Sequence, residues 1–421
     1  MDRKKCVIIG NGAAGISAAE AIRWVDPEAE ITVISEEPCL AYSKVLLHHY
    51  IGGEIEEEGL YIRTEKFYKD LRIHPLLGMK VKKIFPGDRT ILLADESKKK
   101  FDELLIATGS FPLKPPIKGV DQAGVHTLWT LQDARKIRSS LKVSREAIVI
   151  GGSFVGIQAV DALIEFGLKI TVVDIMDRIM PRTLDLESSQ MVQKYLEEKG
   201  VKFALGVRPV EIEDFKKTKK TVHLEDGKSL TGDMIIVAAG ARPSLGIVDG
   251  SPIERNVAIL VDEQMRTNDP NIFAAGDVAE GMDPLTGTRK IFGLWTTAVD
   301  QGKIAGLNMT GKNAVYAGGV DMNSVDILGF PVVTIGKTIQ GRNNEWREEV
   351  FAYPRKRVYR KFLFEKDCLV GAILMGYVED AGLIGYLIRS KGKSDRGECH
   401  FSYGLSKLRE IYLPESSRKA L

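Results

Sequence analysis

The chain lacks a strong excess of charge, long apolar runs and clustered cysteines. Its 421 residues hold 59 Lys and Arg against 57 Asp and Glu, a formal net charge of only +2. This balance gives no support for a nucleic-acid or polyanionic partner. No stretch approaches 18 uncharged apolar residues, so we expect no membrane span. The charged N-terminus leads at once into a glycine loop, and we do not expect it to be a secretory signal.

Cysteine is scarce and scattered. The four cysteines, Cys6, Cys39, Cys368 and Cys399, form no Cys-x-x-Cys pair. This spacing predicts no disulfide framework, no zinc site and no iron–sulfur cluster. We therefore expect a cytoplasmic protein without a metal site. With 44% hydrophobic residues, the chain can still bury a substantial core divided among two to four domains.

Lysine runs at 98–100 and 216–220, the second interrupted by one threonine, lie between strand-like segments. We interpret them as solvated hairpin tips, with docking of an acidic redox protein as the alternative.

Glycine, by contrast, recurs in one pattern at two places about 140 residues apart. In the first, an apolar run typical of a buried parallel strand, 7–9, leads into Gly10, Gly12 and Gly15. Gly10 permits a tight turn, Gly12 lets the backbone approach a pyrophosphate, and Gly15 lets the next helix pack on the strand. This pattern predicts a dinucleotide site.

The residues after the first glycine loop support that prediction. Segment 16–24 has the spacing of a helix, whose first N–H groups would face the phosphates. Segment 31–35 predicts the second strand, and Glu36 follows it, 21 residues after Gly15. A carboxylate at about this offset accepts hydrogen bonds from an adenosine ribose.

The second glycine loop has one departure from the pattern. Gly151 follows the apolar run 148–150 and Gly156 takes the third glycine place, but Ser153 stands at the middle one, putting a hydroxyl and a Cβ near the phosphates. Asp174 ends the next predicted strand, 18 residues after Gly156. An acid there accepts the ribose 2′-hydroxyl and repels a 2′-phosphate, which predicts NADH rather than NADPH.

Three further segments accompany the two loops in a characteristic order: 102–109 follows the first loop, 238–243 follows the second, and 267–277 comes after both. With them, residues 5–380 resemble the flavoproteins of the pyridine nucleotide–disulfide oxidoreductase superfamily. Segments 41–47, 51–55 and 321–324 are similar to NADH:rubredoxin reductases, the flavin part of NADH-dependent nitrite reductase, and flavin subunits of iron–sulfur oxidoreductase complexes.

The resemblance implies an α/β fold with two Rossmann-like dinucleotide-binding domains and a C-terminal α+β interface domain. The NAD domain, 116–243, would be inserted into the FAD domain, 1–115 and 244–315. The interface domain would span 316–421.

The resemblance also implies bound FAD and NADH. Asp277 would bind the ribityl chain of FAD, and the helix after Trp295 would point its N-terminus at the flavin pyrimidine. The residues expected to contact one cofactor or the other are Gly10, Gly12, Ala13, Ala14, Gly15, Glu36, Glu37, Lys44, Val81, Ala107, Thr108, Gly109, Gly151, Gly152, Ser153, Phe154, Val155, Gly156, Asp174, Gly240, Gly276, Asp277, Trp295, Thr296 and Thr297.

Two departures from relatives bear on the chemistry. Disulfide reductases of the superfamily place cysteines beside the flavin, whereas Cys39 lies several residues upstream of the matching place. It is either a small buried or loop cysteine or a redox group in surroundings positive enough to ionise it. Relatives often carry a lysine–glutamate pair near flavin N5, where this chain has His49 and Gln158, the expected catalytic pair. His49 would change charge near neutral pH, unless it is simply a surface histidine.

The function expected from this resemblance is an FAD-dependent NADH:acceptor oxidoreductase. Because the cysteine spacing provides no metal centre, the acceptor would be a separate protein: rubredoxin, ferredoxin or an iron–sulfur subunit. The alternatives are an NADH oxidase or peroxidase, a disulfide or persulfide reductase using Cys39, and a non-catalytic NADH-sensing flavoprotein. The chain would form a homodimer or join a larger complex.

Overall fold

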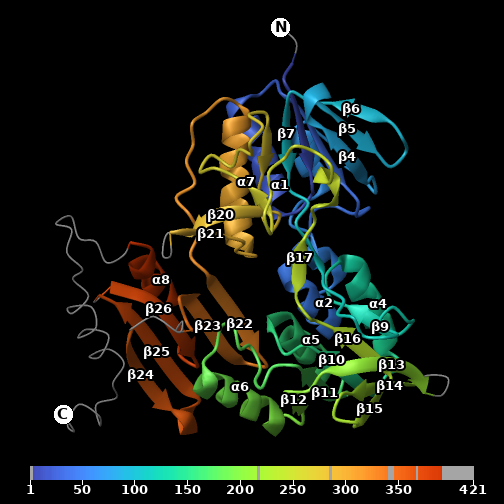
Figure 1. The fold of residues 1–421 in the computed structure, drawn as a ribbon, viewed down its shortest axis with the longest axis vertical. Helices are drawn as coiled ribbons and strands as arrows, with labels where there is room; N and C mark the ends of the chain where they lie inside the picture. The colour runs from blue at the N-terminus through green and yellow to red at the C-terminus, as the bar shows by residue number, and fades with distance from the viewer. Residues whose placement is uncertain (1–2, 216–218, 284–286, 340–345, 367, 391–421) are drawn as a thin grey trace. The chain divides into compact units, whose positions relative to one another are not determined.

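The computed structural model describes residues 3–215, 219–283, 287–339, 346–366 and 368–390 (Figure 1). It separates into two compact units. The first comprises Met1–Met180 and Gln193–Gly319, and the second comprises Pro181–Val192 and Val320–Leu421.

The first unit contains two five-stranded parallel sheets of the same design. One has the strand order β19-β7-β1-β2-β3, and its strands are β1 (Lys5–Ile9), β2 (Glu30–Ser35), β3 (Ile73–Leu77), β7 (Glu103–Ile106) and β19 (Ile272–Ala274). The central strands β1 and β7 are almost wholly buried, as expected for a parallel sheet covered on both faces.

Small residues let two helices pack closely beside this sheet. These helices, α1 (Ala13–Val25) and α7 (Trp295–Met309), lie side by side in Figure 1. A Cβ on Gly302 would lie 2.1 Å from the carbonyl oxygen of Ala14, and one on Gly306 would lie 2.4 Å from that of Ala18. Only glycine permits so close an approach, which fixes where the N-terminus of α7 lies relative to α1.

The second parallel sheet has the order β12-β11-β10-β16-β9. Its strands are β9 (Val125–Thr127), β10 (Glu146–Ile150), β11 (Lys169–Asp174), β12 (Lys202–Leu205) and β16 (Met234–Val237). The helices in this part of the chain are α4 (Leu131–Leu141), α5 (Phe154–Ile164) and α6 (Leu186–Glu198).

Each parallel sheet is accompanied by a three-stranded antiparallel sheet. The first of these is formed by β4 (Val81–Phe85), β5 (Thr90–Leu93) and β6 (Lys98–Lys100), and the second by β13 (Pro209–Phe215), β14 (Lys219–Leu224) and β15 (Ser229–Gly232). The interpretation of 98–100 as a hairpin tip is wrong, because these lysines form β6 and pair with β5. Residues 216–218 of the other lysine run lie outside the described residues.

Shorter elements complete the first unit. Strand β8 (Ser110–Pro112) pairs antiparallel with β17 (Ala241–Pro243). The others are η1 (Lys44–Leu46), α2 (Leu47–Gly52), η2 (Glu57–Leu60), α3 (Glu65–Asp70), η3 (Pro86–Asp88), η4 (Gly246–Val248), β18 (Ile259–Leu260), β20 (Ala279–Asp283) and β21 (Thr288–Lys290).

The second unit is built on an antiparallel sheet. Its order is β22-β23-β26-β25-β24, with strands β22 (Met322–Ile327), β23 (Phe330–Gly336), β24 (Arg347–Tyr353), β25 (Val358–Glu365) and β26 (Cys368–Met375), together with η5 (Pro354–Lys356) and helix α8 (Ala381–Arg389). Asp185 accepts a hydrogen bond of 2.6 Å from the Tyr359 hydroxyl and lies 3.0 Å from the Lys361 ammonium. These contacts tie segment 181–192 to β25.

The predicted fold class is confirmed: the chain combines two Rossmann-like parallel sheets with a C-terminal α+β part. Cys6 and Cys39 are free thiols. Within the described ranges, no helix is long and apolar enough to cross a membrane, and His, Cys, Asp and Glu side chains form no group suited to hold a metal ion.

Candidate cofactor sites

The first glycine loop is held by contacts that only glycine allows. Gly10 has φ +125°, and a Cβ there would lie 2.0 Å from the carbonyl oxygen of Ala107. A Cβ on Gly15 would lie 1.9 Å from the carbonyl oxygen of Gly10. These two glycines therefore pack the loop against the end of β7 and against helix α1.

Gly12 differs from its neighbours because open space surrounds the place of its missing side chain. A Cβ on Gly12 would meet no atom within 4 Å. Gly12 is also the N-cap of α1, and no side chain caps the helix. The first N–H groups of the helix, including those of Ala13 and Ala14, are thus left for a ligand. An uncapped helix start beside open space fits a pyrophosphate.

The acidic residues after β2 lie in two different environments. Glu36 is exposed, and its carboxylate lies 3.1 Å from the Lys80 ammonium. Glu37 is half-buried, accepts a 2.6 Å hydrogen bond from Tyr42 and lies 3.4 Å from Lys44. Glu36 therefore makes one exposed ion pair that a ribose could replace, whereas Glu37 is held by two partners in a half-buried site.

Two further expected contact residues, Val81 and Thr108, are already engaged within the protein. Val81 as a whole, backbone and side chain together, is only 4% exposed. The Thr108 hydroxyl donates a 2.9 Å hydrogen bond to the carbonyl of Ser244. This bond joins the segment just after β7 to the segment by which the chain returns from the second parallel sheet.

Along the chain, Gly276 and Asp277 lie between Ser244 and helix α7. Gly276 has φ +80°, and its N–H donates 2.8 Å to the buried Gln301 side chain. Asp277 accepts a 2.5 Å hydrogen bond from the Ser110 hydroxyl. Helix α7 begins with Trp295, Thr296 and Thr297, and it too lacks a capping side chain.

The second glycine loop repeats this geometry. Gly151 has φ +114°, and a Cβ on Gly156 would lie 1.8 Å from the carbonyl oxygen of Gly151. Ser153, the N-cap of α5, donates its hydroxyl 3.1 Å to the carbonyl of Ala238 and does not cap the helix. The N–H groups at the start of α5, which includes Phe154 and Val155, are therefore also left uncapped.

Asp174 is fixed at the mouth of this loop. Its carboxylate accepts hydrogen bonds from the backbone N–H groups of Gly152, at 2.6 Å, and Met176, at 2.9 Å. Ile175 and Met176 beside it are 59% and 44% exposed, so two apolar side chains face solvent next to the acid that would bind the ribose. The sequence analysis did not single out this exposed apolar pair.

Gly240, with φ +107°, lies where the chain leaves the second sheet, and its carbonyl accepts a 2.8 Å hydrogen bond from Leu113. Helix α4 provides a contrast with α1, α5 and α7. Its N-cap Thr130 and Asp133 form a complete capping box. The three helices that the sequence predicts to face a dinucleotide, α1, α5 and α7, all lack a capping side chain, as do α2, α3 (Glu65–Asp70) and α8.

The expected catalytic pair lies on two helices that pack together, α2 and α5. A Cβ on Gly52 would lie 3.6 Å from the Cα of Ala162. His49 Nδ1 lies 2.9 Å from a carboxylate oxygen of Glu54, a neighbour that the sequence analysis missed. Among the described residues, the buried His49 Nδ1 makes no hydrogen bond, to Gln158 or to any other group. Burial and the nearby His49 lower the pKa of His48 to about 4.

Cys39 lies in half-buried and negatively charged surroundings, which disfavour its thiolate. Burial and the Glu37 carboxylate raise the pKa of its thiol to about 11. The thiol is therefore protonated near neutral pH, which argues against the hypothesis that this cysteine ionises.

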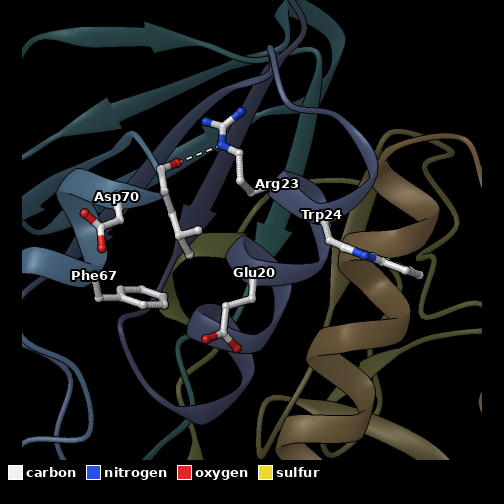
Figure 2. Close-up of a pocket in the computed structure, with 6 residues that line it drawn as sticks. Glu20, Arg23, Trp24, Phe67 and Asp70 are labelled. Atoms are coloured by element: carbon white, nitrogen blue, oxygen red, sulfur yellow. Dashed lines mark hydrogen bonds between the residues drawn. The ribbon is translucent and has the colours of Figure 1, made fainter.

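A separate cavity of about 540 Å³ lies beside the C-terminal half of α1, away from the glycine loop (Figure 2). It is lined by Glu20, Arg23, Trp24, Phe67, Asp70 and Leu71. Arg23 donates hydrogen bonds to the carbonyls of Leu71, Pro27 and Ala29, so its guanidinium serves to tie segments together. None of the expected cofactor-binding residues lines this cavity.

Two glycine loops, each leading into an uncapped helix and each followed by an acid, define a protein that holds two dinucleotides. Residues 4–302 match the model of the pyridine nucleotide-disulphide oxidoreductase family, and this chain belongs to that family. It is an NAD(H)-dependent flavin oxidoreductase with FAD and NADH as its cofactors.

The chain is similar to two characterised proteins and to one solved structure that bear on its function. It is 31% identical to the epsilon subunit of NADH-dependent phenylglyoxylate dehydrogenase from Aromatoleum evansii, covering 92% of each chain. It is 30% identical to the assimilatory nitrate reductase electron transfer subunit of Bacillus subtilis, covering 90% of this chain but only 48% of that relative. Among solved structures, an NAD-dependent persulfide reductase from A. fulgidus shares 29% identity with a TM-score of 0.86, over 92% of this chain and 77% of that one.

Proposed function

We propose that this chain passes electrons between NAD(H) and a separate redox protein: rubredoxin, ferredoxin or an iron–sulfur subunit. The proposal rests on one observation: the compact first unit contains two cradles, each a glycine loop that leads into an uncapped helix. The first cradle is the loop before α1, and the second is the loop before α5. Both nucleotides are then held by the same unit, and positioning supplies much of the catalytic effect.

The proposed division of labour follows the chain. Residues 1–115 and 244–315 form the FAD domain, 116–243 the NAD domain and 316–421 the interface domain, of which 391–421 lie outside the described residues. Gly12, Glu36 and Asp277 hold FAD, together with the N–H groups at the starts of α1 and α7. Gly152 and Asp174 hold NADH, together with the start of α5.

FAD bound at the first glycine loop would supply the chemistry of accepting a hydride from NADH and of releasing electrons singly or in pairs. The residues of this chain position the two nucleotides and balance their charge. The N-terminal dipole of α1 favours the pyrophosphate, and that of α7 favours negative charge on the flavin pyrimidine. His49, whose Nδ1 lies 2.9 Å from a carboxylate oxygen of Glu54, lies on the helix that packs against α5.

The two relatives support a separate acceptor. Both are named as subunits, one of an NADH-dependent dehydrogenase and one that transfers electrons within a nitrate reductase. The chain matches nearly the whole of the first and about half of the second. A chain of about this length is therefore a subunit of an NADH-dependent dehydrogenase in at least one relative.

Disulfide or persulfide reduction is the second candidate, favoured by the likeness to the persulfide reductase. That reaction uses a thiolate beside the flavin, and the cysteine that the resemblance suggests for this role is Cys39. The raised pKa of Cys39 keeps this thiol protonated and weakens the candidate.

Purification of the tagged protein from its native host under anoxic conditions tests the proposal. We expect iron–sulfur or rubredoxin-type polypeptides to copurify, and the complex to reduce them with NADH faster than it reduces oxygen or disulfides. A Cys39→Ser variant serves as the matched control and should behave like wild type.

Three results would contradict the proposal in different ways. A homodimer alone, with rapid oxygen consumption, indicates an NADH oxidase. Loss of activity in Cys39→Ser indicates a disulfide or persulfide reductase. Slow flavin reduction with an NADH-dependent change in oligomer size indicates a non-catalytic sensor.

A further inference from the structure

Trp129 belongs to none of the glycine motifs, yet its side chain contacts two separate parts of the proposed FAD site. Its indole Nε1 donates a 2.7 Å hydrogen bond to the carbonyl of Ser110. The Lys44 ammonium lies over the indole ring, 5.9 Å from its centroid. The Ser110 hydroxyl donates in turn to Asp277 at 2.5 Å. One half-buried side chain thus lies between Lys44 and Asp277.

The backbone beside Trp129 closes a ring of contacts with the loop after β2. The N–H of Leu131 donates 3.0 Å to the Tyr42 hydroxyl, which donates 2.6 Å to Glu37. Glu37 lies 3.4 Å from Lys44, and Lys44 lies over Trp129. Burial and the Glu37 carboxylate raise the pKa of Tyr42, which keeps its hydroxyl protonated and able to donate.

We propose that Trp129 is a positioning residue of the FAD site. Although it lies just before α4, in the segment assigned to the NAD domain, its task is to place Lys44 and Asp277 for FAD. Tryptophan suits this task because its only polar group is an N–H donor, while its ring face attracts a cation. Groups held in place before binding lose less freedom on binding, which increases affinity. The inference rests on the placement of FAD in the first cradle.

Two substitutions separate the roles of the indole. Trp129→Phe keeps an aromatic face for Lys44 but removes the hydrogen bond to Ser110. Trp129→Leu removes both contacts. Trp24→Phe is the matched control, because Trp24 is 79% exposed and lines the cavity of Figure 2 on the far half of α1.

The measurement is the dissociation constant of FAD from the full-length apoprotein. We expect Trp129→Phe to raise it roughly threefold to tenfold, as the loss of one hydrogen bond implies. Trp129→Leu should raise it further, and Trp24→Phe should leave it unchanged. Unaltered FAD binding in Trp129→Phe would overturn the proposal, as would a lower melting temperature of the apoprotein without weaker FAD binding.

A double-mutant comparison tests the route through Lys44. In a Lys44→Met background, Trp129→Leu and Trp129→Phe should weaken FAD binding equally, because the ring then has no cation to position. If the two variants differ as much as they do in the presence of Lys44, the contact with Lys44 contributes nothing.

Gly12→Asp distinguishes failure of this inference from failure of the proposed function. If Gly12→Asp does not weaken FAD binding, the cradle itself is misassigned. If it does and Trp129→Phe does not, only the role of Trp129 is wrong.

Discussion

Replacement of Gly12 by aspartate should weaken FAD binding without lowering the stability of the apoprotein. The site offers a new side chain open space, since a Cβ would meet no atom within 4 Å. Gly12 is also an N-cap with φ −93°, which any residue adopts. Aspartate and asparagine are both favoured N-caps. We therefore expect the apoproteins of Gly12→Asp and Gly12→Asn to be at least as stable as wild type.

The cost appears only when FAD binds. A carboxylate at this place lies near the pyrophosphate, and two like charges about 4 Å apart at an effective dielectric constant of about 20 repel by roughly 4 kcal/mol. Allowing for screening, about 2–4 kcal/mol corresponds to FAD binding weaker by roughly 30-fold to 1,000-fold. Gly12→Asn, which has the same shape without the charge, should lose much less.

Gly15→Ala provides the opposite control. Its Cβ would lie 1.9 Å from the carbonyl oxygen of Gly10, where side chains essentially never approach within 3.0 Å, so the loop must move by about 1 Å. We expect this to cost about 1–3 kcal/mol of stability without any ligand. The assays are FAD titration and thermal unfolding of the apoproteins. Equal FAD affinity of the Asp and Asn variants, or a Gly12→Asp apoprotein less stable than Gly15→Ala, would refute the reasoning.

Three further predictions follow from the structure. Asp174→Asn removes the charge that repels a 2′-phosphate but keeps an oxygen that can accept from a backbone N–H. The ratio of kcat/KM for NADPH to kcat/KM for NADH should therefore rise about tenfold or more. An unchanged ratio would contradict the role of Asp174. The pKa of Cys39 is about 11, against an ordinary value of 9.0. Its alkylation at neutral pH should therefore be about a hundredfold slower than that of an exposed cysteine, and should accelerate only as the pH approaches 11. Rapid labelling at pH 7 would contradict the raised pKa. His48, whose pKa falls from 6.5 to about 4, binds a proton more readily in the unfolded chain, so stability should fall by on the order of 3 kcal/mol as the pH drops from 6.5 to 4. His48→Leu should flatten this dependence of the melting temperature on pH, and an equally steep curve would exclude His48 as its cause.

The features that the sequence predicted well depend on local spacing. Gly10, Gly12 and Gly15 stand within one strand–turn–helix unit, whose geometry follows from a few backbone angles. The same holds for the strand that ends at Asp174. The family resemblance then supplied the order of the two dinucleotide-binding parts.

The features that the sequence did not reveal depend on residues far apart in the chain. The Ser153 hydroxyl turns to Ala238, 85 positions away, and the Trp129 indole binds Ser110 from across the proposed domain boundary. The raised pKa of Cys39 depends on burial and on Glu37, neither of which the spacing of cysteines reveals. The lysines 98–100 form a strand because β5 offers an edge, not because lysine favours strands.

The central claim is that both nucleotides are held at once, so that hydride passes directly from NADH to FAD. Rapid anoxic mixing of the purified holoprotein with NADH, and with NADH deuterated at the transferred position, tests it. The account predicts a fast loss of the yellow flavin absorbance that slows with the deuterated cofactor. A protein that cannot be loaded with FAD, or whose flavin keeps its colour in the presence of NADH, would contradict it.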